Sequence, residues 1–156
     1  MKDGKIHGPM TKWYENGQVN WQGTFKEGLK DGLFEFWHEN GNKRGQEYFR
    51  NGIQINLEIR WHEDGKKDLE ITYYESGKIK SSGKYKNNKK HGEWGFYHEN
   101  GYPQQKGNYK HGKKDGDWLV DKDSNASGRM TKVKYKNGIK RGWSNKALKM
   151  LWEATE

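Results

Sequence analysis

Trp13-Tyr14-Glu15-Asn16-Gly17 is the stretch that decides the fold, because the chain repeats its pattern four more times. The pattern is an aromatic residue, Tyr or His, Glu, a small polar residue and Gly, and it returns at 37–41, 61–65, 73–77 and 97–101. Asn-Gly flanked by β-forming residues is the strongest short-range signal for a β-hairpin. The repeat therefore predicts a tight turn at each place, and we call these the Glu-Asn-Gly turns.

A second turn pattern lies between them, and we call it the lysine turn. Its first copy is Gly4-Lys5-Ile6-His7-Gly8, and it returns with changes at 28–32, 88–92, 112–116 and 138–142. Asn88 takes the place of the first Gly in one copy, and Asn is the next-best residue for a left-handed backbone. We therefore expect a positive φ at this position.

The two kinds of turn together predict a ribbon. Turn signals fall every 11 to 13 residues, with strand-like runs between them, and consecutive strands joined by tight turns pair antiparallel. The expected fold is all-β, an elongated antiparallel β-meander of repeated hairpins over residues 1–143, in about six units. About twelve strands at ~4.8 Å each give a length of roughly 55 Å.

The pattern changes at the C-terminal end, over residues 144–156. Ser144 can cap a helix, and Leu148, Leu151 and Trp152 share one helical face. A repeat array leaves an unpaired strand edge at its end. We expect a short C-terminal helix over 144–156 that covers the last hairpin.

The repeat slips by half a unit in the middle of the chain. The turn glycines at 17, 41 and 65 are 24 residues apart, as are Gly77 and Gly101, but only 12 residues separate Gly65 from Gly77. In a regular meander the lysine turns share one edge of the ribbon and the Glu-Asn-Gly turns share the other. The slip can exchange these edges beyond residue 65.

Three sets of aromatic residues recur with the turns. Equivalent positions of a stacked repeat lie on one face, so the set four residues before each turn glycine should form a ladder: Trp13, Trp37, Trp61, Tyr73 and Tyr97. The second and third sets lie on the following strands: Phe25, Phe49, Tyr85, Tyr109 and Tyr135, then Phe34, Trp94 and Trp118. Gly23, Gly83 and Gly107 precede three of the second set by two residues, which predicts that a neighbouring ring covers bare backbone there.

The composition favours a thin folded sheet. Only 29% of residues are hydrophobic and 33% are charged, but the chain has 8 Trp, 9 Tyr and 5 Phe. Disordered segments are poor in aromatic residues, and each buried ring removes roughly 150–250 Å² from water. Stacking of rings between neighbouring hairpins is thus the expected source of stability.

Composition also excludes several classes of site. The sequence has no cysteine, which excludes disulfides, zinc-thiolate sites and cysteine nucleophiles. No apolar run reaches the ~18 residues of a membrane-spanning helix, and Met1-Lys2-Asp3-Gly4 lacks the apolar stretch of a signal peptide. A cytoplasmic location is the default expectation.

The recurring histidines and glutamates do not predict a reaction centre. His38, His62 and His98 hold one repeat position, and equivalent atoms one hairpin apart are separated by ~9.5 Å, whereas the ligands of one metal ion lie about 3 Å apart. Catalysis needs one asymmetric constellation, and a Glu in every turn does not provide it. We expect no enzyme activity, no metal and no cofactor.

The charge points to an acidic partner. The chain has 30 Lys and Arg against 21 Asp and Glu, a net charge of +9, which favours an acidic protein face, nucleic acid or an anionic membrane surface. General solubility is the alternative, and turn charges can also serve only to protect hairpin tips from aggregation. The candidate partner-binding residues are the turn cations and three aromatic anchors: Lys30, Lys89, Lys90, Lys113, Lys114, Lys140, Arg141, Trp37, Trp61 and Tyr97.

The paired turn motifs resemble the MORN repeat, and more closely its bacterial variant, the YwqK-type antitoxin family, over residues 4–142. The resemblance implies a hairpin ribbon that acts by binding. MORN arrays scaffold proteins, dimerise or contact phospholipids, and the bacterial variants resemble toxin-neutralising or immunity proteins.

Two functional hypotheses follow. The first is a non-catalytic inhibitor that neutralises an acidic protein surface or a nuclease by stoichiometric binding, as an antitoxin, immunity protein or counter-defence factor. The alternative is a basic β-ribbon that binds nucleic acid, with stacked bases, or anionic lipid. Open strand edges also fit a homodimer.

Overall fold

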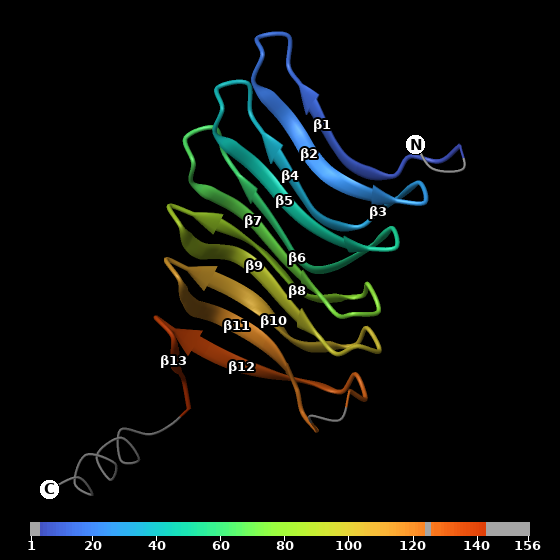
Figure 1. Cartoon of the computed structure of the whole chain (residues 1–156). Helices are drawn as coiled ribbons and strands as arrows, with labels where there is room; N and C mark the ends of the chain where they lie inside the picture. Colours follow the sequence, from blue (N-terminus) through green and yellow to red (C-terminus); the bar gives the residue numbers. More distant parts are fainter. Residues whose placement is uncertain (1–3, 124–125, 143–156) are drawn as a thin grey trace, which may run out of the picture.

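A computed structural model describes residues 4–123 and 126–142, which form one antiparallel sheet of 13 strands (Figure 1). Neighbouring strands follow chain order, with the two-residue β3 paired to β2 beside this path. The predicted all-β meander is confirmed, while the predicted helix over 144–156 lies outside the described residues. No described helix is long and apolar enough to span a membrane.

The strands are β1 (Gly8–Trp13), β2 (Val19–Lys26), β3 (Leu29–Lys30), β4 (Gly32–Trp37), β5 (Lys43–Arg50), β6 (Ile53–Trp61), β7 (Lys67–Tyr73), β8 (Ile79–Lys86), β9 (Lys89–Tyr97), β10 (Pro103–Lys110), β11 (Lys113–Asp121), β12 (Met130–Lys136) and β13 (Ile139–Lys140).

The lysine turns have the left-handed backbone that the sequence predicts. Asn88 has a φ of 58°, and Gly28, Gly112 and Gly138 have φ values of 83°, 83° and 86°. The preceding residue also has positive φ in each of these four copies, as Asn87 does at 52°. Two successive positive φ values are the mark of a type I′ turn, whose twist matches that of the strands it joins.

The half-repeat slip places two kinds of turn on the same edge. In a meander, alternate connections lie at one edge, so the Glu-Asn-Gly turns that precede β2, β5 and β7 share an edge with the lysine turns that precede β9, β11 and β13, on the left in Figure 1. The backbone N–H of Lys67 donates to Asn88 Oδ1 at 2.8 Å across this boundary. At the opposite edge, Arg50 pairs with Glu75 at 2.6 Å. We call the edge that carries Asn88 the first edge and the edge that carries Arg50 and Glu75 the second edge.

The slip also exchanges the two faces of the sheet. Phe34 lies opposite Glu47, and the same row of paired residues continues through Glu58, Ile71 and Ser82 to Gly95. Paired residues share a face, so the neighbouring Trp94 points to the face opposite that of Phe34. The reason is geometric. One additional strand reverses the chain direction of every equivalent strand after it, while each new strand is still added on the same side of the sheet. That change is a half-turn about the growth axis, which exchanges edges and faces together.

The core is consequently split into two ring clusters on opposite faces. Phe34 is 1% exposed and lies at the centre of the first, the N-terminal ring cluster of Trp21, Phe25, Phe34 and Phe49. Trp94 and Trp118 are both fully buried and form the centre of the second, the C-terminal ring cluster of Tyr85, Trp94, Phe96, Tyr109, Trp118 and Tyr135. Within it, rings meet edge to face, as Tyr109 and Trp118 do at 5.1 Å between centroids.

The second and third aromatic sets are therefore the core, as predicted, but they do not share one face. The prediction that the first set forms a stacked ladder is wrong: among the described residues no ring of that set stacks on another, and Trp13 is 57% exposed. Each of these rings sits beside a shift in strand register next to a turn. A bulge there turns the side chain away from the regular face.

A neighbouring ring covers the backbone at Gly23, Gly83 and Gly107, as the sequence predicts. A Cβ at Gly23 would stand 2.5 Å from the ring of Phe34, and one at Gly107 would stand 2.6 Å from the ring of Trp118. Gly83 faces Trp94 in the same way and lies directly opposite it across the strands. The bare backbone lets each central ring lie flat on the neighbouring strand.

Candidate functional site

The positive charge of the chain is concentrated in one corner of the sheet. Residues 84–93, 108–117 and 132–141 each span a hairpin tip at the first edge, and we call the three stretches the basic corner. Of the chain's 30 Lys and Arg, twelve lie here, against three of its 21 Asp and Glu. The remaining residues hold 18 of each sign, so the corner carries the entire +9.

The same kind of turn lacks this charge in the N-terminal half. Residues 24–33 span the equivalent lysine turn and contain two lysines and two acidic residues, and residues 48–57 contain one arginine and no acid. Charge that served only solubility would be spread over all turns. The corner is therefore a local property of the C-terminal half.

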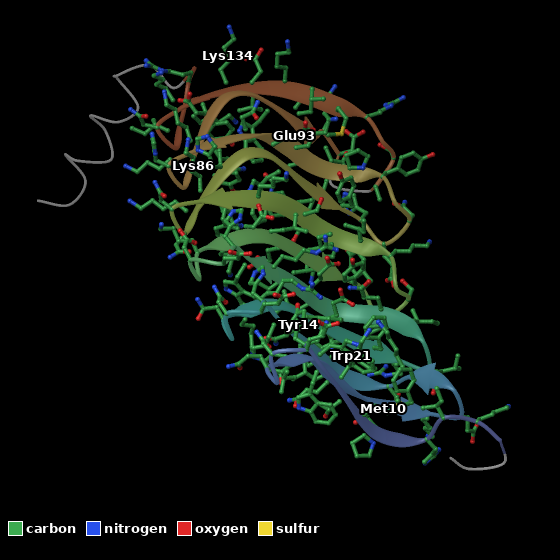
Figure 2. All side chains as sticks on the ribbon, turned by 90° about the horizontal axis from the view of Figure 1, so that it is seen from above. Met10, Tyr14, Trp21, Lys86, Glu93 and Lys134 are labelled. Atoms are coloured by element: carbon green, nitrogen blue, oxygen red, sulfur yellow. The ribbon has the colours of Figure 1, made fainter. Side chains whose placement is uncertain are left out.

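Most corner cations are free to meet a partner. Lys132 and Lys136 pair with Asp117 at 3.3 Å and with Asp115 at 3.8 Å, while the other ten form no ion pair with a described residue. Lys86 and Lys134 extend away from the ribbon at this end of the sheet (Figure 2). Eight of these ten side chains are exposed: Lys84, Lys86, Lys89, Lys110, Lys113, Lys134, Lys140 and Arg141.

Two of the corner lysines have a structural role instead. The ammonium groups of Lys90 and Lys114 lie 3.9 Å and 4.1 Å from the ring centroids of Trp94 and Trp118. Burial lowers the pKa of both lysines. Lys30 holds the equivalent place in the other cluster, 4.5 Å from the ring of Phe49. Cation–π contacts of this kind stabilise the clusters.

The structure divides the predicted binding residues. Four of them lie together as exposed residues of the basic corner: Lys89, Lys113, Lys140 and Arg141. Lys30 lies apart from them, toward the second edge and on the opposite face from Lys90 and Lys114. Trp37 and Trp61 are half-buried at the first edge beside the Glu-Asn-Gly turns, and Tyr97 is half-buried at the second edge, so the three aromatic anchors do not join the corner.

Sequence reasoning missed half of the basic corner. The additional cations lie on the strands and not in the turns: Lys84, Lys86, Lys110, Lys132, Lys134 and Lys136. Three of them end β8, β10 and β12, and this recurrence just before a turn was the available signal.

Where the faces switch, the carboxylate of Glu58 is buried and bonded within the sheet. Glu58 is 4% exposed and accepts hydrogen bonds from Tyr73 Oη at 2.9 Å and Gln54 Nε2 at 3.0 Å, with Arg60 at 2.7 Å. Burial raises the pKa of Glu47, which lies opposite it. Glu58 thus has structural partners in the sheet, and Lys30 lies 3.9 Å from the carboxylate of Glu47.

The same arrangement returns twelve residues later on the other face. Glu70 Oε2 accepts hydrogen bonds from Tyr85 Oη at 3.2 Å and from Lys67 at 3.0 Å. Burial, together with the neighbouring Glu70 charge, raises the pKa of Tyr85 to about 12. The Glu-Tyr pair is thus a part of the repeat that the slip carries from one face to the other.

Tyr85 should make stability depend on alkaline pH. An unfolded tyrosine ionises near pH 10, whereas folded Tyr85 keeps its proton up to about pH 12. Its contribution is therefore fully present below pH 10 and is lost as the pH rises from 10 to 12. We expect the fall in unfolding free energy over this interval to be smaller in Tyr85→Phe by about 1 kcal/mol after solvent screening. Urea unfolding at pH 9.5 and 11.5 measures it, and the control Tyr102→Phe should behave as wild type.

Two of the recurring histidines, His38 and His98, link one hairpin to the next. Nε2 of His38 lies 3.0 Å from the carbonyl oxygen of Trp61, and Nε2 of His98 lies 2.9 Å from Oδ2 of Asp121. Tyr14 makes the same link by donating to the carbonyl of Trp37 at 2.8 Å. In residues 4–123 and 126–142, no group of three His, Asp or Glu is placed to hold a metal ion.

The repeat geometry agrees with a family comparison. A family model described as MORN repeat variant matches residues 6–27, 30–51, 69–87 and 90–111, which together are more than half of the chain. The chain belongs to the MORN repeat variant family. Each matched MORN segment contains one hairpin closed by a Glu-Asn-Gly turn: β1–β2, β4–β5, β7–β8 and β9–β10.

The MORN segments also locate the slip. Two matched segments precede residue 52 and two follow residue 68, and the strand between them is β6. This one additional strand separates two regular pairs of MORN hairpins and reverses the edge and face of the second pair. No curated protein matches the chain.

Proposed function

We propose that this MORN-variant chain is a non-catalytic binding module that docks its basic corner on an acidic protein surface. It neutralises that partner by one-to-one binding, as an antitoxin, immunity protein or counter-defence factor does. The observation that supports the proposal is the confinement of the whole +9 charge to three adjacent hairpin tips. A single-sign patch of this kind steers an oppositely charged partner and fixes its orientation.

The dimensions of the corner suit a protein face. The three tips at the first edge are separated by two strands each, so they span roughly 19 Å. A standard interface buries about 800 Å² on each partner, which accommodates this length. The tips are short type I′ turns on a continuous sheet, so the cations project from a rigid support and binding orders little extra chain.

The ring clusters favour a protein partner over single-stranded nucleic acid. Proteins that bind single strands stack the bases on exposed aromatic rings. The two tryptophans nearest the corner, Trp94 and Trp118, are fully buried and carry lysines on their faces. Their rings are therefore occupied within the sheet.

A pair of charge variants tests the proposal. The corner variant changes Lys86, Lys89, Lys110 and Lys113 to Gln, and the control variant changes Lys12, Lys26, Lys78 and Lys122 to Gln. All eight side chains are exposed, and both variants lose four charges. We expect only the corner variant to lose affinity, by at least about tenfold. Capture from extract of the native host with wild-type protein, followed by light scattering and calorimetry of the purified complex, identifies the partner and measures its stoichiometry.

The outcomes separate the hypotheses. A one-to-one complex with a cytoplasmic protein whose activity is inhibited supports the proposal. Equal loss of affinity in both variants contradicts it, because the effect would then follow total charge. Tight oligonucleotide binding with a steep salt dependence, or co-sedimentation with vesicles that contain anionic lipid, each without a protein partner, also contradicts it.

A further inference from the structure

The outer side of β12 is an open strand edge within the basic corner. β12 pairs with β11 through six residue pairs from Met130 to Tyr135, but it pairs with β13 only at its last two residues. The carbonyl of Lys134 accepts from the N–H of Arg141 at 2.7 Å on this outer side. Backbone groups two residues apart point the same way, so the N–H and C=O of Lys132 also face outward. In the part of the chain that the structure describes, no strand pairs with this stretch.

A hollow lies along the same unpaired backbone. Its volume is about 550 Å³, and it is lined by Thr131, Lys132, Val133, Lys134, Lys140, Arg141 and Gly142. One wall is the open part of β12 and the other is the end of β13. The hollow therefore presents an unpaired strand edge together with four cationic side chains.

The two faces of β12 differ in character. Val133 lies opposite Trp118 and Tyr135 contacts the ring of Trp118, so these side chains extend the C-terminal ring cluster. Lys132 and Lys134 alternate with them and lie on the other face. A strand added beside β12 would thus meet apolar neighbours on one face and a row of lysines on the other.

The strand at the opposite end of the sheet offers no such combination. β1 contains Pro9, which has no N–H to donate, and a single lysine, Lys12. Proline on an end strand is a common protection against added strands. Among the described strands longer than two residues, only β12 combines an open backbone with concentrated positive charge.

We propose that the outer side of β12 binds an extended acidic segment of the protein partner as an additional β-strand. Acidic side chains at alternate positions of that segment meet Lys132, Lys134 and Arg141, and the intervening apolar side chains lie beside Val133. Backbone hydrogen bonds supply affinity and the alternating side chains supply specificity. This inference rests on the proposed function and states how the acidic partner is held.

N-methylated peptides test strand addition directly. The probe is a fluorescent seven-residue peptide of alternating Glu and Val with blocked ends, and its binding to the full chain is followed by anisotropy. Two further peptides are N-methylated, one at every Glu and one at every Val. Alternate residues of an added strand point their N–H groups toward β12, so one methylation pattern should weaken binding by about tenfold or more while the other has little effect.

A matched pair of variants of the chain tests the contribution of the β12 backbone. Lys132→Gln removes the charge and keeps the N–H, whereas Lys132→Pro removes both. An end strand tolerates proline where its N–H faces solvent. We expect Lys132→Pro to bind the probe about tenfold more weakly than Lys132→Gln. Should the proline variant fail to fold, amide exchange of the wild-type chain replaces it: the probe should slow exchange at Lys132 but not at Thr131 or Val133, whose N–H groups face β11.

The outcomes distinguish this inference from the proposed function. Equal effects of the two methylation patterns, or no change in exchange at Lys132, overturn strand addition while partner capture through the corner still stands. A Lys132 amide that exchanges slowly before the probe is added shows that this side is already covered, and overturns it as well. A chain that ignores the acidic probe and binds an oligonucleotide of the same length contradicts both proposals.

Discussion

Replacing Trp94 by Ala should lower the free energy of unfolding by about 3–5 kcal/mol, the range for removing a fully buried large aromatic ring. The ring is at the centre of the C-terminal ring cluster and meets Tyr85, Phe96 and Tyr109. Its indole N–H donates to the carbonyl of Lys84 at 2.9 Å, and the ammonium of Lys90 covers its face. The variant loses all of these contacts and leaves a cavity in a sheet that is one layer thick.

The matched control is Trp13→Ala. Trp13 is 57% exposed and belongs to the aromatic set next to the Glu-Asn-Gly turns, so its loss should change the unfolding free energy by no more than about 0.5 kcal/mol. Urea unfolding followed by circular dichroism measures both variants on one scale. Equal destabilisation by the two substitutions would show that the rings beside the turns, and not the buried clusters, hold the ribbon together.

Replacing Gly83 by Ala should destabilise the chain by about 1–3 kcal/mol, the usual cost of overpacking a filled core. The added Cβ would overlap the Trp94 ring, which is fully buried and cannot move into free space. In contrast to a turn glycine, Gly83 has no positive φ, so the cost comes from the ring alone.

Two controls isolate that cause. Gly45 also lacks a positive φ, and a Cβ there would stand 3.4 Å from the Phe36 ring, an ordinary contact. Gly45→Ala should therefore change stability by less than about 1 kcal/mol in either direction. In the Trp94→Ala background, Gly83→Ala should cost much less than it does alone, since the obstructing ring is gone. A cost that is unchanged in that background would assign the effect to the backbone.

Several local features could be predicted from the sequence because they depend on a few neighbouring residues. The positive φ of Asn88, the ring over Gly83 and the recurrence of Phe34 and Trp94 in the core all follow from turn chemistry and strand alternation. The ladder predicted for Trp13 and its equivalents failed because a register shift beside each turn rotates those side chains out of the regular face.

The basic corner could be predicted only in part. Lys89, Lys113, Lys140 and Arg141 lie in the turns that the sequence singled out. Lys30 belongs to the same turn pattern, but β6 stands between it and the others and places it toward the opposite edge. The open side of β12 was also beyond the sequence, because its hydrogen-bond partners depend on how far β13 continues.

By itself the sequence determined that the chain forms hairpins, where they turn, and which rings fill the core, since each of these depends on contacts within about one repeat. Only the tertiary structure decided that the core occupies both faces and that the entire net positive charge gathers at one corner. The physical reason is that a sheet adds strands in one direction. A single additional strand therefore rotates every later repeat by half a turn, and this displacement accumulates along the array without leaving a mark in any one turn.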